Sequence, residues 1–120
     1  MRMWMVDPKI LCLNHLLAEH SETHMFIGSI KKKIKMNGYH QNDLLEPMSL
    51  LTRHEELVNE FKRRNLNHKS DLIFDNDVFS YLSEQIKNHV IDSKNSLHIL
   101  LSKCDKCKKR YDELNQGILK

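Results

Sequence analysis

The sequence contains few of the residues that interrupt regular structure, with 3 glycines and 2 prolines in 120 residues. Few segments alternate polar and apolar residues as half-buried strands do, so the composition favours helices. No apolar run approaches the roughly 18 residues that a membrane span requires. The opening residues are interrupted too soon by Asp7 and Pro8 to form a signal peptide. We therefore expect an all-α protein with a single compact domain over residues 1–120 and no contact with a membrane.

Cysteine and net charge limit the class of protein further. The 3 cysteines are odd in number and follow no secretory signal, so we expect reduced thiols in an intracellular protein. We expect it in the cytoplasm, beside the nucleoid, or in a nucleus or virion if the source is a eukaryote or a virus. The net charge is +3 and the pI is about 8.8, below the pI of about 9 that marks strongly basic nucleic-acid binders.

The basic residues gather in three clusters, each near the end of an expected helix. These are Lys31, Lys32, Lys33 and Lys35; Lys62, Arg63 and Arg64; and Lys103, Lys106, Lys108, Lys109 and Arg110. Cationic side chains at helix C-termini interact favourably with the helix dipole. From charge alone, solvated helix ends therefore explain these clusters better than a bound ligand does.

Hydrophobic spacing predicts three main helices and one short helix around a single core. Asp7 as N-cap and Pro8 at the first helical position should open a helix that runs to about Lys35 and stops at Asn37-Gly38. The other predicted elements are a loop over residues 38–46, a helix from Ser49 to about Arg64, an irregular stretch from His68 to Asp77, a short helix within residues 78–90, and a last helix from about Asp92 or Ser93 to Leu114. The last helix carries the clearest apolar stripe.

Four side chains of the first predicted helix share one face. At about 100° per residue these are His15, Glu19, Glu22 and Phe26. A stripe with two carboxylates and an imidazole is usually the hydrated face of a helix. The other interpretation is the polar floor of a cleft, in which neighbouring carboxylates raise each other's pKa and one donates a proton. The helix alone does not decide between the two.

The N-terminus offers a candidate nucleophile. Arg2 is too large for methionine aminopeptidase to remove Met1, so we expect the mature chain to begin at Met1. Terminal α-amines have pKa values of roughly 7.7–8.0, against roughly 10.4 for lysine amines, so a usable fraction of them is neutral at cellular pH. An amine held beside a carboxylate can attack a carbonyl-like carbon and form an imine. We expect Trp4 to pack this N-terminal arm onto the helices, although Trp4 and Tyr39 could instead stack on an exposed base.

Cys104-Asp-Lys-Cys107 is a C-x-x-C motif, which can be half of a zinc site or a redox pair. A zinc site needs four ligands, and His98 or Cys12 could complete this one only through a fold contact that the sequence does not reveal. Both thiols lie on the apolar stripe of the last helix, where small buried cysteines are common. We therefore expect no metal and no cofactor.

His20 and His24 lie one helical turn apart and could in principle chelate a metal. The zinc-protease pattern places a glutamate next to its first histidine, whereas Glu22 lies two residues away. We therefore interpret the two histidines as a pair on the surface of the helix.

Two segments and the spacing of the N-terminus resemble a known family. The segments are Asn14-His-Leu-Leu-Ala-Glu-His-Ser-Glu22, with Gly28 six residues later and Met1 fourteen residues before His15, and Glu56-Leu-Val-Asn-Glu-Phe-Lys-Arg-Arg-Asn-Leu-Asn67. They look like the phage pyrimidine-dimer DNA glycosylase/AP lyase family, also called endonuclease V, and most closely like its short bacterial and viral relatives. The resemblance is strong in the first helix, moderate in the second, and limited to helical character and position in the third.

The resemblance implies an imine mechanism and assigns residues to it. It places the nucleophilic α-amine on Met1, the essential acid on Glu22, the active-site histidine on His15 and a phosphate contact on Arg2. The amine would attack the anomeric carbon of a damaged nucleotide and displace the base, and β-elimination from the imine would cut the strand. The nucleotide must first be extruded from the duplex, at an unstacking cost of a few kcal/mol.

The sequence departs from the phage pattern beside the essential acid. Ser21 and Met25 stand where the phage enzyme has arginines that hold phosphates. This departure predicts a weaker salt dependence and favours cleavage at abasic sites over excision of pyrimidine dimers.

The sequence as a whole therefore predicts a DNA-repair glycosylase/AP lyase that acts as a monomer on damaged double-stranded DNA. The residues predicted to act in catalysis are Met1, Glu22 and His15; those predicted to bind DNA are Arg2, Lys31, Lys32, Lys33, Arg63 and Arg64; and Glu19, His20 and His24 are predicted to support them. The alternatives are a non-catalytic module that binds duplex DNA and a helical interaction module, both on the same scaffold.

Overall fold

Helices are the only regular structure in residues 1–68 and 70–119, which this computed structural model describes. The longer helices among these residues are α1 (Leu13–Lys31), α3 (Leu50–Arg63), α5 (Ser93–Lys103) and α6 (Asp105–Asn115). The shorter elements are α2 (Asn37–Gln41), α4 (Glu84–Lys87) and the 3-10 turns η1 (Pro8–Ile10), η2 (Pro47–Ser49) and η3 (Asn76–Phe79). The predicted all-α class and single compact domain are confirmed. Within the same residues, no helix has both the length and the apolar character of a membrane span.

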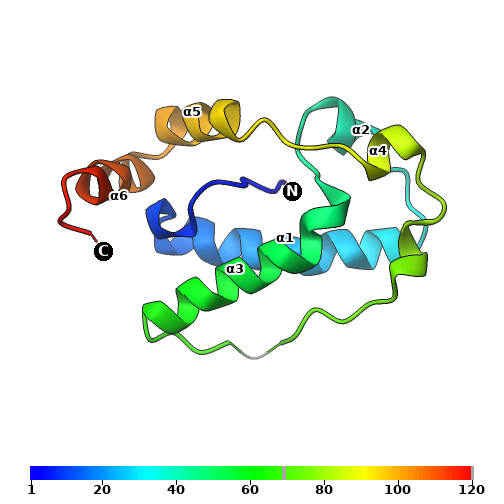
Figure 1. The fold of residues 1–120 in the computed structure, drawn as a ribbon, viewed down its shortest axis with the longest axis horizontal. Coiled ribbons are helices and arrows are strands. Elements are labelled where there is room, and N and C mark those ends of the chain that lie inside the picture. Colours follow the sequence, from blue (N-terminus) through cyan, green and yellow to red (C-terminus); the bar gives the residue numbers. More distant parts are fainter. Residues whose placement is uncertain (69, 120) are drawn as a thin grey trace.

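The N-terminal arm, residues 1–7, runs in extended form through the middle of the molecule. It passes between α5 on one side and α1 and α3 on the other, so that the N-terminus lies among the helices (Figure 1). Met3, Trp4 and Val6 are buried along its length. The predicted packing of the arm onto the helices is therefore confirmed.

Hydrogen bonds from three separate parts of the chain hold the arm in place. The Met3 backbone N–H donates to the Leu44 carbonyl at 2.8 Å, and the Trp4 carbonyl accepts from Ser96 Oγ at 2.6 Å. The Val6 carbonyl accepts from Arg53 Nη1 at 2.7 Å. Because buried backbone groups need such partners, these bonds fix both the depth and the direction of the arm.

The first predicted helix is two elements, so its predicted start was wrong. Asp7 does cap a helical turn, since its Oδ1 accepts from the Lys9 N–H at 3.0 Å, but that turn is the short η1. The backbone is extended at Leu11 and Cys12, and α1 begins only at Leu13. At this break the side chains of Leu11 and Cys12 are both buried in the core.

The end of α1 also differs from the prediction. The helix stops at Lys31, and Lys33 takes a left-handed backbone conformation with φ 58°. Asn37-Gly38, predicted to terminate the first helix, instead opens the short helix α2 within the predicted loop.

The middle of the chain agrees better with the sequence. The helix predicted from Ser49 to about Arg64 is α3, preceded by η2. The described residues of the stretch predicted as irregular form no helix before η3, and the short helix expected within residues 78–90 is α4.

The last predicted helix is broken at Cys104, so a single helix to Leu114 was wrong. Cys104 has an extended backbone, with φ −128° and ψ 105°, and is both the C-cap of α5 and the N-cap of α6. Its Sγ accepts from the Cys107 N–H at 3.4 Å, which caps α6. Figure 1 shows the change of direction between the two helices.

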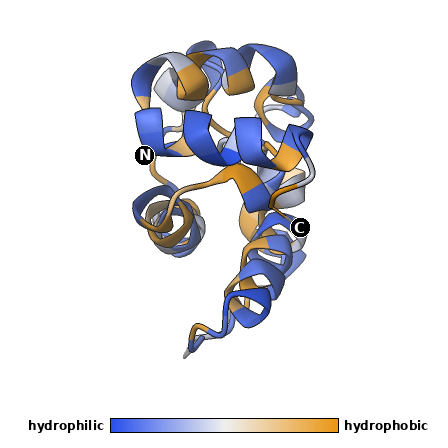
Figure 2. Cartoon of the chain, turned by 90° about the vertical axis from the view of Figure 1, so that its left-hand side faces the viewer, coloured by the Kyte–Doolittle hydropathy of each residue, from blue (hydrophilic) through white to orange (hydrophobic). Residues whose placement is uncertain are grey.

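The buried apolar residues form two clusters along the arm. One contains Met3, Phe26, Ile27, Ile30, Met36, Leu45, Leu50, Leu72, Phe79, Leu82, Ile86 and Ile91. The other contains Trp4, Val6, Ile10, Leu11, Cys12, Leu16, Leu57, Phe61, Leu100 and Cys107. Hydrophilic and hydrophobic residues alternate along the helices in Figure 2, as expected for helices that bury one face.

Candidate active site

The nitrogen of Met1 lies 4.0 Å from Oε1 of Glu22. Met1 comes from the arm and Glu22 from α1, and their side chains are 14% and 22% exposed, so both are partly shielded from water. Burial is the largest influence on Glu22 and raises its pKa; the N-terminal charge opposes this, the carboxylate of Glu19 adds to it, and Arg2 opposes it. Glu22 therefore keeps a proton at higher pH than an ordinary glutamate, as a general acid requires.

Glu19, one turn before Glu22, is fully buried and paired with Arg53 of α3. Two hydrogen bonds join them, from Nε to Oε2 at 2.6 Å and from Nη2 to Oε1 at 2.9 Å. The interpretation of this carboxylate face as hydrated is therefore wrong for Glu19. Sequence reasoning missed Arg53, although it lies on the buried face of α3, three residues after Leu50 and four before Leu57.

This ion pair connects the three segments that surround the amine. Arg53 binds Glu19 of α1 and, through Nη1, the carbonyl of Val6 in the arm. Bidentate pairs between arginine and carboxylate are directional, so they set orientation as well as distance. The pair thereby fixes the arm against α1 close to Glu22.

Arg2 lies against Trp4 instead of extending into solvent. Its guanidinium carbon is 3.7 Å from the centroid of the Trp4 ring, and Nη2 donates to Ser96 Oγ at 3.2 Å. Burial lowers the pKa of Arg2, and the nearby carboxylates partly compensate. Its Nε is buried and has no hydrogen-bond partner among the described residues. This donor thus makes no hydrogen bond within the described part of the chain.

His15 lies among cysteines and does not contact the α-amine of Met1. Its Nδ1 is 3.2 Å from Sγ of Cys12 and 3.5 Å from Sγ of Cys107. It is about 10 Å from Glu22 along α1, because a helix rises about 1.5 Å per residue. The catalytic role predicted for His15 therefore gains no support from its position.

His20 and His24 belong to a cluster with His54 and His68, in which His54 is buried and the other three are partly exposed. The His20 ring centroid lies 5.1 Å from that of His24, 4.9 Å from that of His54 and 4.9 Å from that of His68. Burial, followed by the three neighbouring imidazoles, lowers the pKa of His20 to about 4. The Nε2 atoms of His20, His54 and His68 are buried without hydrogen-bond partners in the described structure. Sequence reasoning did not predict this cluster, because His54 comes from α3 and His68 from the chain after it.

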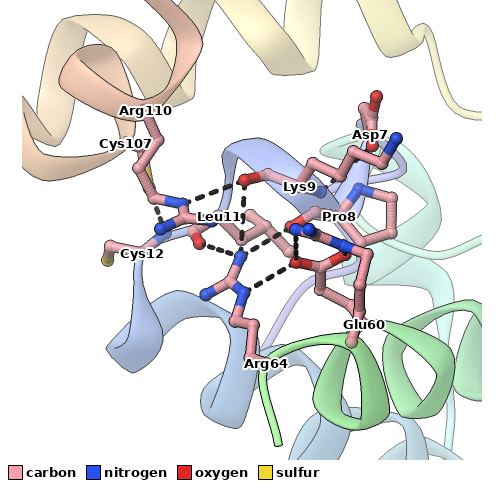
Figure 3. A network of polar contacts seen from close by, with 10 residues as sticks. Asp7, Pro8, Lys9, Leu11, Cys12, Glu60, Arg64, Cys107 and Arg110 are labelled. Atoms are coloured by element: carbon pink, nitrogen blue, oxygen red, sulfur yellow. Dashed lines mark hydrogen bonds and ion pairs between the residues drawn. The ribbon is translucent and has the colours of Figure 1, made fainter. Parts of the chain in front are cut away.

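Two of the arginines predicted to bind DNA make contacts within the protein. Arg64 Nη2 donates to the carbonyls of Pro8 at 3.1 Å and Leu11 at 2.7 Å, and its Nε donates to Glu60 at 2.7 Å (Figure 3). Arg63 pairs with the same carboxylate at 2.5 Å and remains 38% exposed. Arg64 thus joins α3 to η1, whereas Arg63 keeps part of its surface accessible.

The lysines at the end of α1 are more accessible. Lys31 Nζ donates to the Ile73 carbonyl at 3.2 Å, and Lys32 and Lys33 are exposed. These three side chains are therefore accessible from solvent, and long lysine side chains are flexible.

A cavity of about 340 Å³ lies elsewhere, between the arm and the last two helices. It is lined by Met5, Val6, Asp7, Ile10, Ser93, Lys94, Leu97, Tyr111, Leu114 and Asn115. Neither Met1 nor Glu22 is among them, so this cavity is separate from the amine and its carboxylate.

Comparison with protein families matches residues 1–74 to the family described as pyrimidine dimer DNA glycosylase. The matched residues include the arm, α1 and α3, and hence both Met1 and Glu22. No curated protein and no solved structure matches the chain. Because the match covers 74 of 120 residues, this chain belongs to the pyrimidine dimer DNA glycosylase family.

Proposed function

We propose that this protein is a DNA glycosylase/AP lyase that acts as a monomer on damaged duplex DNA, with the α-amine of Met1 as its nucleophile. The observation that supports this most directly is the 4.0 Å distance between the Met1 nitrogen and Glu22. An amine and a partly buried carboxylate in this arrangement are the two groups that an imine mechanism needs.

The proposed reaction begins when the neutral amine attacks C1′ of the damaged nucleotide. A bond forms from the nitrogen to C1′, and the glycosidic bond breaks as the base leaves with its electron pair and takes up a proton. Opening of the sugar ring then gives the imine, with the proton for O4′ supplied by Glu22. Loss of a proton from C2′ and cleavage of the C3′–O bond complete β-elimination and cut the strand. At an existing abasic site, the same sequence begins from the sugar aldehyde and releases water.

Glu22 suits both proton transfers because burial raises its pKa. Its protonated form donates to the ring oxygen, and the resulting carboxylate accepts a proton later in the cycle. The carboxylate also stabilises the positive charge of the protonated imine at short range, in a site partly shielded from water.

Arg2 is suited to hold the phosphate next to the reacting nucleotide. Its guanidinium is positioned by Trp4 and Ser96, while its buried Nε has no partner among the described groups. A movement of the guanidinium away from Trp4 would expose that donor to a phosphate oxygen, with which arginine forms strong hydrogen bonds. The exposed Lys32 and Lys33 and the accessible part of Arg63 would add sequence-independent contacts to the backbone.

Borohydride trapping tests the proposal. Untagged protein, incubated with duplex DNA containing one abasic site and with borohydride, should form a covalent adduct whose mass identifies Met1 as the attached residue. Glu22→Gln should reduce trapping and strand cleavage by at least about 100-fold, in line with the 10²–10⁴-fold effects of general acid–base groups. The matched control is Glu84→Gln, an exposed glutamate on α4, which should leave both rates unchanged. Absence of the adduct, or full activity of Glu22→Gln, would contradict the mechanism and leave a DNA-binding module.

A further inference from the structure

Four potential metal ligands from opposite ends of the chain meet beside the arm. Cys12 and His15 lie at the start of α1, and Cys104 and Cys107 lie at the start of α6. The Cys12 sulfur is 3.2 Å from His15 Nδ1 and 3.8 Å from the Cys104 sulfur. The Cys107 sulfur is 3.5 Å from His15 Nδ1. All four ligand atoms lie within 4.8 Å of one another.

These separations match those of ligands around a tetrahedral zinc ion. With Zn–S near 2.3 Å and Zn–N near 2.0–2.1 Å, tetrahedral angles place two sulfurs about 3.8 Å apart and a sulfur and a nitrogen about 3.6 Å apart. The measured distance between the Cys12 and Cys104 sulfurs is 3.8 Å, and the two measured distances from sulfur to His15 are 3.2 and 3.5 Å. The three distances are thus close to those of a tetrahedral centre, and the four ligand atoms lie close enough together for one ion.

Helix N-termini and backbone N–H groups face the sulfurs. Cys12 is the N-cap of α1 and Cys104 is the N-cap of α6, so both sulfurs lie at the positive ends of helices. The Cys12 N–H donates to the Cys107 sulfur at 3.2 Å, and the Cys107 N–H donates to the Cys104 sulfur at 3.4 Å. Backbone N–H groups that point at sulfur stabilise negative charge there and hold the ligands in place.

The ligand set is closed rather than open to substrate. Cys12 and Cys107 are 6% and 0% exposed, and the Trp4 ring lies edge-on to His15 with their centroids 5.7 Å apart. Catalytic zinc sites keep one position for water or substrate, whereas structural sites use four protein ligands. Three cysteines and one histidine are a usual structural set.

We propose that Cys12, His15, Cys104 and Cys107 bind one Zn²⁺ as a structural site that fastens α6 to the start of α1. The proposal accounts for both breaks that the sequence did not predict, at Leu11–Cys12 and at Cys104. Each break places a cysteine at a helix N-cap and a second ligand three residues later. A disulfide would use two of the sulfurs and would leave the third sulfur and His15 without a role.

The first experiment measures the metal content of the full-length, untagged protein, expressed with zinc in the medium and purified under reducing conditions without chelator. We expect about one zinc per chain, released when a mercurial reagent titrates the thiols. Exchange of zinc for Co²⁺ should give thiolate-to-cobalt charge-transfer bands and the intense visible bands of a tetrahedral centre. These measurements do not depend on activity toward DNA, so they separate this proposal from the proposed function.

Three variants locate the metal. Cys104→Ser, at the least buried of the three cysteines, should lose most of the zinc. His98→Gln, at an exposed histidine of α5, should keep it. His68→Gln should also keep it, and tests whether zinc instead occupies the histidine cluster around His54.

Three results would overturn the proposal. The first is wild-type protein with three free thiols and no bound metal, and the second is a disulfide found by mass spectrometry of protein kept reduced during purification. The third is loss of zinc in His68→Gln with retention in Cys104→Ser. If Cys104→Ser fails to fold, the cobalt spectrum of the wild-type protein distinguishes the cysteine site from the histidine cluster. A centre without thiolate ligands lacks the charge-transfer bands.

Discussion

The carboxylate of Glu19 and the guanidinium of Arg53 form two hydrogen bonds in the interior, at 2.6 and 2.9 Å, although the residues are 34 positions apart. Glu19 is 0% and Arg53 2% exposed, so neither charge has water as an alternative partner. Loss of one partner therefore leaves an uncompensated buried charge, which is far more costly than loss of a surface ion pair.

Arg53→Met should consequently destabilise the protein by about 3–5 kcal/mol, the range for removal of one member of a buried pair. Urea unfolding followed by circular dichroism measures this loss. The double variant Glu19→Leu/Arg53→Met should recover part of it, because no unpaired charge remains. Additive effects of the two substitutions would show that the two groups are not energetically coupled.

Blocking the N-terminus should abolish trapping without unfolding the protein. Acetylation of Met1, or one added residue before it, removes the free amine or displaces it from Glu22, whereas the core contacts of Met3 and Trp4 remain. We expect at least a 100-fold loss of adduct with abasic duplex and a melting temperature close to that of the wild type. The control is the same single residue added at the C-terminus instead. Equal trapping by both tagged forms would identify a different nucleophile.

Stability should fall as the pH drops through the range between the unfolded and folded pKa values of His20. The pKa of His20 is about 4 in the folded protein, against about 6.5 in unfolded chains. Between these values the unfolded state binds the additional proton, so stability is lost from about pH 6.5 down to about pH 4, by at most about 1.4 kcal/mol per pH unit for one group. Urea unfolding at intervals between pH 7 and pH 4.5 measures the slope.

The comparison that isolates His20 is His20→Gln, which cannot take up the proton. The difference in stability between wild type and variant should change with pH in this window and stay constant above it. Burial also lowers the pKa of His24, so part of the pH dependence will remain in the variant. A difference that does not change with pH would mean that the pKa of His20 is the same in the folded and unfolded states.

His15→Cys separates the two roles considered for this residue. A fourth cysteine can still bind zinc, because four thiolates also form a structural site, but a thiol does not replace a catalytic imidazole. We expect this variant to retain zinc and at least half of the trapping rate, and His15→Ala to lose zinc. Retention of zinc with loss of trapping in His15→Cys would instead support the catalytic role.

Sequence reasoning predicted the features that depend on local patterns. The stripe of α3 and its limits were recognisable because the apolar residues follow one helical period and Pro47 precedes the start. The resemblance to the family predicted the pair of Met1 and Glu22, and the arm was expected to pack because Trp4 is large and apolar.

The features that were missed depend on contacts between distant segments. Nothing near Cys12 in the sequence shows that Cys104 lies beside it, and nothing near Arg53 identifies Glu19 as its partner. The break at Cys104 was missed for the same reason, since α5 and α6 together have the apolar spacing of one helix. Local periodicity describes a helix well, but it does not contain the long-range pairings that decide where a helix ends.

The hydrogen bond between Ser96 and the Trp4 carbonyl has a consequence for the order of events during synthesis. The ribosome makes Ser96 long after Trp4, so the opening residues emerge before the group that anchors them exists. The first residues of the arm therefore stay open to the surrounding solution until synthesis has passed Ser96. The bond that holds the arm against α5 forms only after that point.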